Sequence, residues 1–303
     1  MEIHQLQYIL EVAKHRHFTR AAEAICVGQS SLSQQIGKLE DELGVKLFER
    51  TTRRVYPTPA GEEFIQCARR ILAEIESAKQ CMDAHSGVLR GMLNVGTIPT
   101  LTNIDFGSIM ASFHQLHPGL NLNIVQEGSH KLLELLRLRE IEIALLTLPF
   151  LDDCRDMEII HLAEDEYVFV MSETHRLAKR KSIDLSEVAN ENFVFHKKEQ
   201  SIYHICLQAC RQAGFEPKIV CQSTGNSISF ALISSGMGIG FFPKEDVRTT
   251  RCKGIVSVKL TKPIKKRIVL AIPNSTYHAP PVVAFHQYVT QWFAQSTGDK
   301  FNK

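Results

Sequence analysis

Two neighbouring groups of hydrogen-bonding side chains carry the clearest chemistry in this sequence. The first group is uncharged and consists of Gln29, Ser30, Ser31, Ser33, Gln34 and Gln35. Glutamine can pair with N6 and N7 of adenine, and serine hydroxyls suit either bases or phosphates. The second group follows closely and consists of Arg50, Arg53 and Arg54, beside Thr51 and Thr52. Such residues on a turn are typical donors to phosphate, so the two groups together predict a surface that binds duplex DNA.

Three short helices are predicted to position the first group. Apolar residues at helical spacing indicate a helix over 3–14, and Thr19 is the expected N-cap of a second helix that ends near Ile25. A third helix is predicted from about Gln29, with Gly28 as its N-cap and Gly44 as its stop. Its core side is expected to hold Leu32, Ile36, Leu39 and Leu43. The polar group then projects from the remaining surface, although a polar helix face or a basic loop is often merely solvated.

The order of these residues resembles the winged helix-turn-helix of the LysR-type transcriptional regulators, over about the first 60 residues. The resemblance is carried by FTRAAEAICVGQSSLSQQIGKLEDELGVKLFER and then TPAG. It implies a DNA-binding domain over 1–58, in which Ala21 and Ala22 pack the second helix against the third. The expected DNA contacts are Thr19, Arg20, Gln29, Ser30, Ser31, Ser33, Gln34, Lys38, Arg50, Arg53 and Arg54. The sequence departs from the family at Gly28, where Ser is common, and at Ser30-Ser31, where Pro-Ala is common.

A long helix is expected to follow as a linker over 59–88. Thr58 can cap it, Pro59 suits its first position, and Gly87 is expected to end it after about 40 Å. Apolar residues recur along it at spacings of 4 and 3, as in a coiled-coil seam: Phe64, Ala68, Ile71, Ile75, Ala78, Met82 and His85. The helix could pack against its own C-terminal domain, but a two-chain seam is favoured. The family resemblance implies a homodimer through this helix, often associated further into a homotetramer.

Residues 89–303 show short apolar strands that alternate with helices, which indicates an α/β domain. Strands are predicted at 92–97, 120–125, 141–147, 167–171, 192–195, 238–242 and 266–272, and helices near 103–116, 130–139, 202–213, 227–235 and 281–295. This order resembles the two-lobed, periplasmic-binding-protein-like (type 2) effector domain of the same family. One lobe is then expected from 90–162 with 268–303, and the other from 163–267. The whole chain is therefore predicted to be multi-domain: an α winged helix-turn-helix with a linker helix, followed by an α/β effector domain.

Hydroxyl groups at the ends of the predicted strands indicate where a small effector binds. Ligands of open α/β sheets lie at the carboxyl ends of strands, against helix N-termini. The expected effector-binding residues are Thr97, Thr100, Thr102, Ser129, Thr147 and His196. They would suit a carboxylate or another small anion, and the family resemblance supports Thr100 and Ser129 in particular. The alternative is that the Thr and Ser residues only cap helices, and that His196 lies on the surface beside two lysines.

The eight cysteines lack metal-type pairs, and most are expected to be small buried hydrophobes. A redox alternative rests on Cys206 and Cys210, which lie one helical turn apart. Peroxide-sensing members of the family pair two cysteines nine residues apart, and the resemblance places Cys210 at the second position and Ser201 at the first. The first cysteine is therefore absent, which disfavours a thiol-based sensor.

Length and composition limit the remaining function classes. The chain has 303 residues, 44% of them hydrophobic, and a net charge of +2, so only local clusters can argue for nucleic acid. No apolar run approaches the roughly 18 residues of a membrane span, and no signal pattern is present, so we expect a cytoplasmic chain without a membrane partner.

An enzyme and a transporter-linked solute-binding protein are the alternatives, but the sequence contains no nucleophile elbow, GxGxxG, Walker loop or metal cluster. We expect no cofactor; the expected partners are promoter DNA, the effector, a second copy and RNA polymerase.

Overall fold

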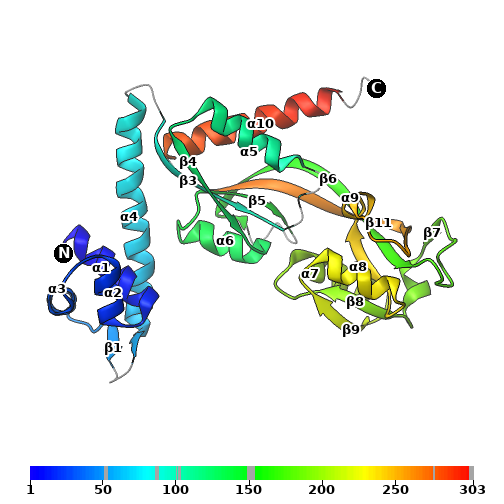
Figure 1. The fold of residues 1–303 in the computed structure, drawn as a ribbon, viewed down its shortest axis with the longest axis horizontal. Coiled ribbons are helices and arrows are strands. Elements are labelled where there is room, and N and C mark those ends of the chain that lie inside the picture. The colour runs from blue at the N-terminus through cyan, green and yellow to red at the C-terminus, as the bar shows by residue number, and fades with distance from the viewer. Residues whose placement is uncertain are drawn as a thin grey trace. The chain divides into compact units, whose positions relative to one another are not determined.

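The computed structural model describes residues 1–50, 54–85, 89–99, 101, 104–148, 154–275 and 277–299 (Figure 1). Contacts between Cα atoms divide the chain into two compact units. Unit 1 comprises Met1–Val88 with Arg137–Glu140, and unit 2 comprises Leu89–Leu136 with Ile141–Lys303. Each unit has its own elements and core.

Unit 1 is a three-helix domain with a small wing. Its helices are α1 (Ile3–His15), α2 (Phe18–Ala24) and α3 (Gln29–Leu43), and its wing pairs β1 (Phe48–Arg50) antiparallel with β2 (Val55–Pro57). One apolar cluster joins the three helices and the wing, and it includes Ile9, Val12, Ala21, Ala22, Leu32, Ile36, Leu39, Leu47, Phe48 and Val55. The predicted winged helix-turn-helix is confirmed, because the apolar spacing of each helix matches the face that it buries.

The helix ends agree with the prediction except at α2. Gly28 is the N-cap of α3, and Gly44 ends that helix in the left-handed conformation at φ 72°. Thr19, however, is not an N-cap: α2 begins one residue earlier, and Nδ1 of His17 accepts from the Thr19 amide instead. The imidazole nitrogen can take the place of a hydroxyl oxygen as acceptor, which the preference for Thr did not reveal. Leu43 was also expected in the core, but it is exposed at the frayed end of the helix.

The long helix α4 (Pro59–His85) begins where it was predicted. The hydroxyl of Thr58 accepts from the Gly61 amide at 2.9 Å and so caps the first turn. Ala68 is fully buried within its own chain, whereas Ile71 and Met82 are exposed. The predicted seam is therefore only partly exposed: Ala68 is packed, Ile75 is half-buried, and Ile71, Ala78 and Met82 are open. Gly87 lies outside the described residues.

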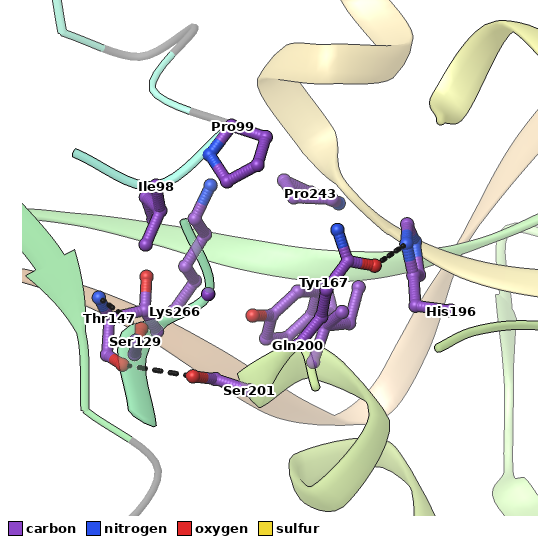
Figure 2. Close-up of a pocket in the computed structure, with 12 residues that line it drawn as sticks. Ile98, Pro99, Ser129, Thr147, Tyr167, His196, Gln200, Ser201, Pro243 and Lys266 are labelled. Atoms are coloured by element: carbon purple, nitrogen blue, oxygen red, sulfur yellow. Dashed lines mark hydrogen bonds between the residues drawn. The ribbon is translucent and has the colours of Figure 1, made fainter. Parts of the chain in front are cut away.

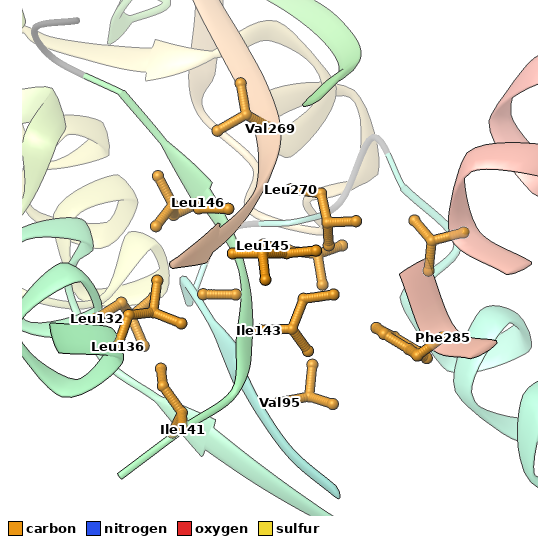
Figure 3. Packing of buried hydrophobic residues seen from close by; sticks show 14 of the residues in the cluster. Val95, Leu132, Leu136, Ile141, Ile143, Leu145, Leu146, Val269, Leu270 and Phe285 are labelled. Atoms are coloured by element: carbon orange, nitrogen blue, oxygen red, sulfur yellow. The ribbon is translucent and has the colours of Figure 1, made fainter. Parts of the chain in front are cut away.

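The first part of unit 2, which we call lobe I, is a parallel sheet covered on both faces. It contains β3 (Gly91–Thr97), α5 (Phe106–Leu116), β4 (Leu120–Gln126), α6 (Ser129–Arg137), β5 (Ile143–Thr147) and α10 (Pro280–Asp299). β3 pairs in parallel with both β4 and β5. Figure 3 shows Leu132 and Leu136 of α6 on one face of this sheet and Phe285 of α10 on the other. Every residue of β5 is buried, as expected for a strand covered on both faces.

The second part, lobe II, is built around aromatic side chains. It contains β7 (Ser182–Ile183), the 3-10 helix η2 (Leu185–Val188), β8 (Asn192–His196), α7 (Ser201–Gln212), β9 (Lys218–Ser223), α8 (Asn226–Ser234), β10 (Gly240–Pro243) and α9 (Lys244–Thr249). β8 and β9 pair in parallel, and Phe193, Phe195 and Phe241 pack against one another in the core. The sequence prediction missed β7, η2, β9 and α9.

Two long antiparallel strands connect the lobes. β6 (Met157–Ser172) and β11 (Ile255–Pro273) pair along most of their length, and the sheet order is β10-β6-β11-β5-β3-β4. Leu162 and Ile268 belong to the core of lobe I, whereas Phe169 and Val258 belong to the core of lobe II. The prediction of separate strands at 167–171 and 266–272 was too short, because polar residues interrupt the apolar pattern in the middle of both strands. No described helix is long and apolar enough to cross a membrane.

Candidate functional site

Helix α3 presents the polar group that the sequence singled out. Leu32, Ile36 and Leu39 are completely buried, which turns the opposite side of the helix outward. The exposed residues on and around that side are Thr19, Arg20, Gln29, Ser30, Ser31, Gln34 and Lys38, and Ser33 is half-buried. This arrangement supplies neutral donors and acceptors on one helix face, with a cation from Lys38 farther along.

Two buried polar side chains that the sequence analysis overlooked hold α3 in place. Glu40 is 2% exposed, and its carboxylate accepts from the amides of Leu47 and Phe48 at 2.9 and 3.2 Å. It therefore fastens the end of α3 to the first wing strand. Gln5, also buried, donates Nε2 to the Gln35 carbonyl oxygen at 3.3 Å. The sequence did contain a sign that Glu40 is paired. This acid lies beside the apolar face of the helix, where burying a carboxylate without a partner would be costly.

The wing arginines occupy different environments. Arg50 Nη1 donates to Ser33 Oγ at 2.9 Å, and its Cζ lies 4.6 Å from the centroid of the Phe18 ring. Arg54 is exposed and donates to the Tyr56 hydroxyl at 3.4 Å, and this bond raises the pKa of Arg54. Arg53 lies outside the described residues. The structure thus brings Arg50 against the polar face of α3 and leaves Arg54 at the surface.

A second candidate site is a pocket between the two lobes of unit 2 (Figure 2). Lobe I contributes Ile98, Pro99, Gly128, Ser129 and Thr147, lobe II contributes His196, Gln200, Ser201, Ile202 and Pro243, and the connecting strands contribute Tyr167 and Lys266. The N-terminal residues of α6 and α7 both belong to this lining. The cavity measures about 30 Å³, which is room for one or two water molecules.

Hydrogen bonds cross the pocket and show which polar atoms are already used. Ser129 Oγ accepts from the Thr147 amide at 3.2 Å, and Ser201 Oγ donates to the Thr147 carbonyl oxygen at 3.2 Å, so Thr147 links both lobes. Gln200 Oε1 lies 3.1 Å from His196 Nδ1. Of the side-chain atoms in the described lining of this pocket, Thr147 Oγ1 and His196 Nε2 are buried without a hydrogen-bond partner. Buried polar atoms of this kind mark places where a ligand or water can bind.

The charge of the pocket is set by Lys266, whose side chain is only 1% exposed. Figure 2 shows it reaching from β11 between Ile98 and Pro243 toward Pro99. Burial lowers the pKa of Lys266, whereas the carboxylates of Asp246 and Asp165 act in the opposite direction. Lys266 is the only acidic or basic side chain apart from His196 and Tyr167 in the described lining, and Asp246 and Asp165 outside that lining partly balance its charge.

Burial also keeps His196 neutral. It lowers the pKa of His196 from 6.5 to about 4, and Lys266 contributes further in the same direction. The hydrogen bond with Gln200 opposes that shift but does not cancel it. At neutral pH His196 therefore offers a hydrogen bond rather than a positive charge.

The six predicted effector residues fall into three groups. Ser129, Thr147 and His196 line the pocket. Thr97 is buried beside it and donates its hydroxyl to the Ile98 carbonyl oxygen at 3.3 Å. Thr100 and Thr102 lie outside the described residues. The sequence analysis missed Lys266 because a lysine in the run KPIKKR is typical of a solvated strand, and only the fold places this one inside.

The two cysteines considered for redox chemistry lie in surroundings that are typical of structural cysteines and not of reactive ones. Cys206 and Cys210 are free thiols buried in the core of lobe II. Burial raises the pKa of Cys206 well above its ordinary value and that of Cys210 to about 12. The thiolate is the reactive form, so neither side chain is activated for oxidation in this conformation. Ser201, at the predicted first position, lines the pocket instead.

Comparison with known proteins matches both units to one family. The family model "Bacterial regulatory helix-turn-helix protein, lysR family" matches residues 3–62, and "LysR substrate binding domain" matches residues 86–294. The transcriptional dual regulator GltC of Bacillus subtilis is 31% identical over 297 residues, which cover 97% of this chain and 98% of GltC.

Two further similar proteins are a regulator named for hydrogen peroxide and an OxyR protein of solved structure. The hydrogen peroxide-inducible genes activator of Escherichia coli O157:H7 is 29% identical over 270 residues, covering 89% of this chain and 88% of that protein. The crystallised full-length OxyR of Pseudomonas aeruginosa, in a cysteine-substituted form, superposes with a TM-score of 0.73. It is 25% identical and covers 95% of this chain and 94% of its own.

Proposed function

We propose, from the premise that this chain belongs to the LysR family of DNA-binding transcription regulators, that it reads a specific DNA sequence and responds to a small anion. The DNA-reading surface would be the exposed side of α3 with the wing. The anion would bind in the pocket between the two lobes.

One observation carries the ligand part of the proposal: the N-termini of α6 and α7 come from different lobes and meet at the pocket that Lys266 enters. Helix N-termini carry unsatisfied amides and the positive end of the helix dipole. Both therefore attract an anion, and Lys266 adds a full positive charge when it is protonated. Thr147 Oγ1, unpartnered among the described atoms, supplies a further hydrogen-bonding group.

The dimensions of the pocket favour a small ligand or one that separates the lobes. A cavity of about 30 Å³ accommodates at most a carboxylate group, so an inorganic oxyanion such as sulfate would have to widen it, and it is far below the several hundred Å³ of a drug-sized site. A larger organic acid would place only its carboxylate here. Because lining residues come from both lobes, binding favours one relative arrangement of them, and this difference in affinity is what can shift a conformational equilibrium.

Dimerisation through α4 completes the proposed mechanism. Ile71 is 38% exposed and Met82 is 63% exposed on this helix, and both belong to the predicted two-chain seam. Pairing these turns with a second copy would bring two winged domains to one DNA site. A change between the lobes could then alter how both domains contact and bend DNA, and thereby affect RNA polymerase.

The ligand proposal is tested by a thermal-shift screen of the full-length protein. The probes are mono- and dicarboxylates, aromatic carboxylates, sulfate and phosphate, with neutral amides of the same acids as controls. An anion that binds only the folded state raises the unfolding temperature, by an amount that grows with concentration. If no anion stabilises the protein more than its neutral counterpart, the anion proposal is wrong.

The DNA proposal is tested with selected and random duplexes. Gln29→Ala and Ser33→Ala should weaken binding to the selected site more than to random DNA, because they remove contacts to bases. Arg53→Ala should weaken both and reduce the dependence on salt, since it removes a contact to phosphate. Equal wild-type affinity for all sequences would contradict a specific reader.

Redox sensing is the second candidate, and the name of one similar protein, a hydrogen peroxide-inducible genes activator, motivates it. The buried thiols of Cys206 and Cys210 and the serine at position 201 argue against it. DNA affinity should therefore stay the same after peroxide treatment, in the wild type and in Cys206→Ser alike. A change that Cys206→Ser abolishes would instead support a thiol sensor.

A further inference from the structure

Arg50 is held by three contacts inside unit 1. Its Nη1 donates to Ser33 Oγ at 2.9 Å, its Cζ stands 4.6 Å from the Phe18 ring centroid, and its Nη2 lies 4.0 Å from Glu40 Oε2. Glu40 is 1% exposed at its side chain and Phe18 is buried, so two of the three partners are fixed by the core. The Arg50 side chain, although 43% exposed, is therefore restricted in orientation.

These contacts use the geometry of the guanidinium group as well as its charge. A flat guanidinium can stack on an aromatic ring while its edge donates several hydrogen bonds, which an ammonium group cannot do in the same way. With its Cζ over the Phe18 ring and its two Nη atoms toward Ser33 and Glu40, Arg50 links α2, α3 and the first wing strand. An arginine that served only as a phosphate contact would not need this set of partners.

The hydrogen bond determines what Ser33 can offer to DNA. A serine hydroxyl has one proton and two lone pairs. Arg50 donates to one lone pair, and its positive charge polarises the O–H bond, so the Ser33 proton is directed to another acceptor. In the major groove, the acceptors are O6 and N7 of guanine, N7 of adenine and O4 of thymine.

We propose that Arg50 is a positioning residue for sequence recognition, which holds Ser33 as a hydrogen-bond donor to an acceptor on a base edge. The inference rests on the proposed function, because it requires α3 to lie in the major groove. It differs from the expectation that Arg50 contacts phosphate, and the two roles predict different dependences on sequence and on salt.

The experiment first selects a DNA site from a random pool with the full-length wild type. Affinities for this site and for a random duplex are then measured from low to high salt for wild type, Arg50→Lys, Ser33→Ala and the double variant. Arg50→Lys keeps the charge but not the planar geometry. It should weaken binding to the selected site roughly fivefold, the effect of one lost hydrogen bond, and leave the affinity for random DNA and the salt slope unchanged. Ser33→Ala should add nothing to Arg50→Lys, because both changes disable the same contact.

Arg54→Ala provides the matched control for a wing arginine that contacts phosphate. It should weaken binding to both duplexes and reduce the salt slope by about 0.9. The inference is overturned if the neutral variant Arg50→Gln weakens binding to both duplexes and reduces the salt slope as Arg54→Ala does. It is also overturned if Arg50→Lys leaves binding to the selected site unchanged, or if its effect and that of Ser33→Ala multiply in the double variant. Thermal unfolding of each variant, with Arg50→Gln as a second substitution, verifies that unit 1 remains folded. If the wild type enriches no sequence, the proposed DNA reading itself is wrong. If it enriches a sequence but Arg50→Lys and Ser33→Ala act independently on the affinity for that site, only the proposed role of Arg50 is wrong.

Discussion

At the scale of single residues, burial decides which charges the interlobe pocket presents. His196 loses its ordinary basicity because the folded chain removes its ring from water, and its pKa falls to about 4. Lys266 is also buried, but the carboxylates of Asp246 and Asp165 act against the loss of its proton. A neutral imidazole and a lysine supported by carboxylates thus lie around the same small cavity.

The shift at His196 predicts a loss of stability in mild acid. Below pH 6.5 the unfolded chain binds a proton at this residue, whereas the folded chain does so only below about 4. Stability is therefore fully present above pH 6.5 and decreases as the pH falls to about 4, by about 3 kcal/mol from this group. Urea unfolding of wild type and His196→Gln at several pH values measures the difference. An identical pH dependence in the two proteins would show that His196 does not titrate in this way.

The position of a residue could be predicted where chemistry and place in the fold coincided. Ser129 and Thr147 line the pocket as expected, because hydroxyls at strand ends and helix starts face the ligand side of an α/β sheet, while their role in binding stays a prediction. The positions of Lys266 and Glu40 could not be predicted, since lysine and glutamate are usually exposed and only tertiary packing shows that these two are buried. Thr19 is a different case. Threonine favours the N-cap position, but His17 occupies that position of α2 in the structure.

At the scale of elements, close backbone contact fixes the start of α4 against the wing. A Cβ atom on Gly61 would overlap the backbone carbonyl group of Leu47, whereas one on Gly37 in the middle of α3 would meet nothing within 4 Å. Gly61→Ala should destabilise unit 1 by about 2 kcal/mol, a typical cost of overpacking against a backbone that cannot move freely. Gly37→Ala should instead stabilise it by up to about 1 kcal/mol, through helix propensity. Denaturant unfolding of the two variants compares them, and equal effects would argue against the tight contact.

Regular elements were predictable where one apolar pattern continued without interruption. The periodicity of α3 and α4 indicated their helical faces, their cap residues gave their starts, and the strand predicted to end at Thr147 matched β5 closely. β6 and β11 were underestimated because each passes from one lobe to the other, and its pattern changes from a buried to a solvated environment on the way. Their continuity is a property of the tertiary fold, which local sequence does not encode.

At the scale of the whole molecule, the exposed part of α4 predicts self-association. Ile71→Lys with Met82→Lys should shift the protein toward monomer, because charges would replace apolar side chains in the proposed two-chain seam. Glu74→Lys, at an exposed position outside the predicted seam, is the control. Sedimentation velocity over a range of concentrations reports the mass. If the double variant associates as strongly as the control, the seam lies elsewhere.

The central claim is that an anion held by Lys266 controls DNA binding. The most direct measurement is fluorescence anisotropy of the selected DNA site, with and without a saturating anion from the thermal-shift screen. The comparison uses wild type and the variant Lys266→Met/Asp246→Asn, which removes one buried charge of each sign so that neither is left uncompensated. In the wild type the anion should change the DNA dissociation constant by at least about fivefold, a typical allosteric coupling. The variant should bind DNA as the ligand-free wild type does and should not respond to the anion. An equal response in both proteins, or none in the wild type, would contradict the account.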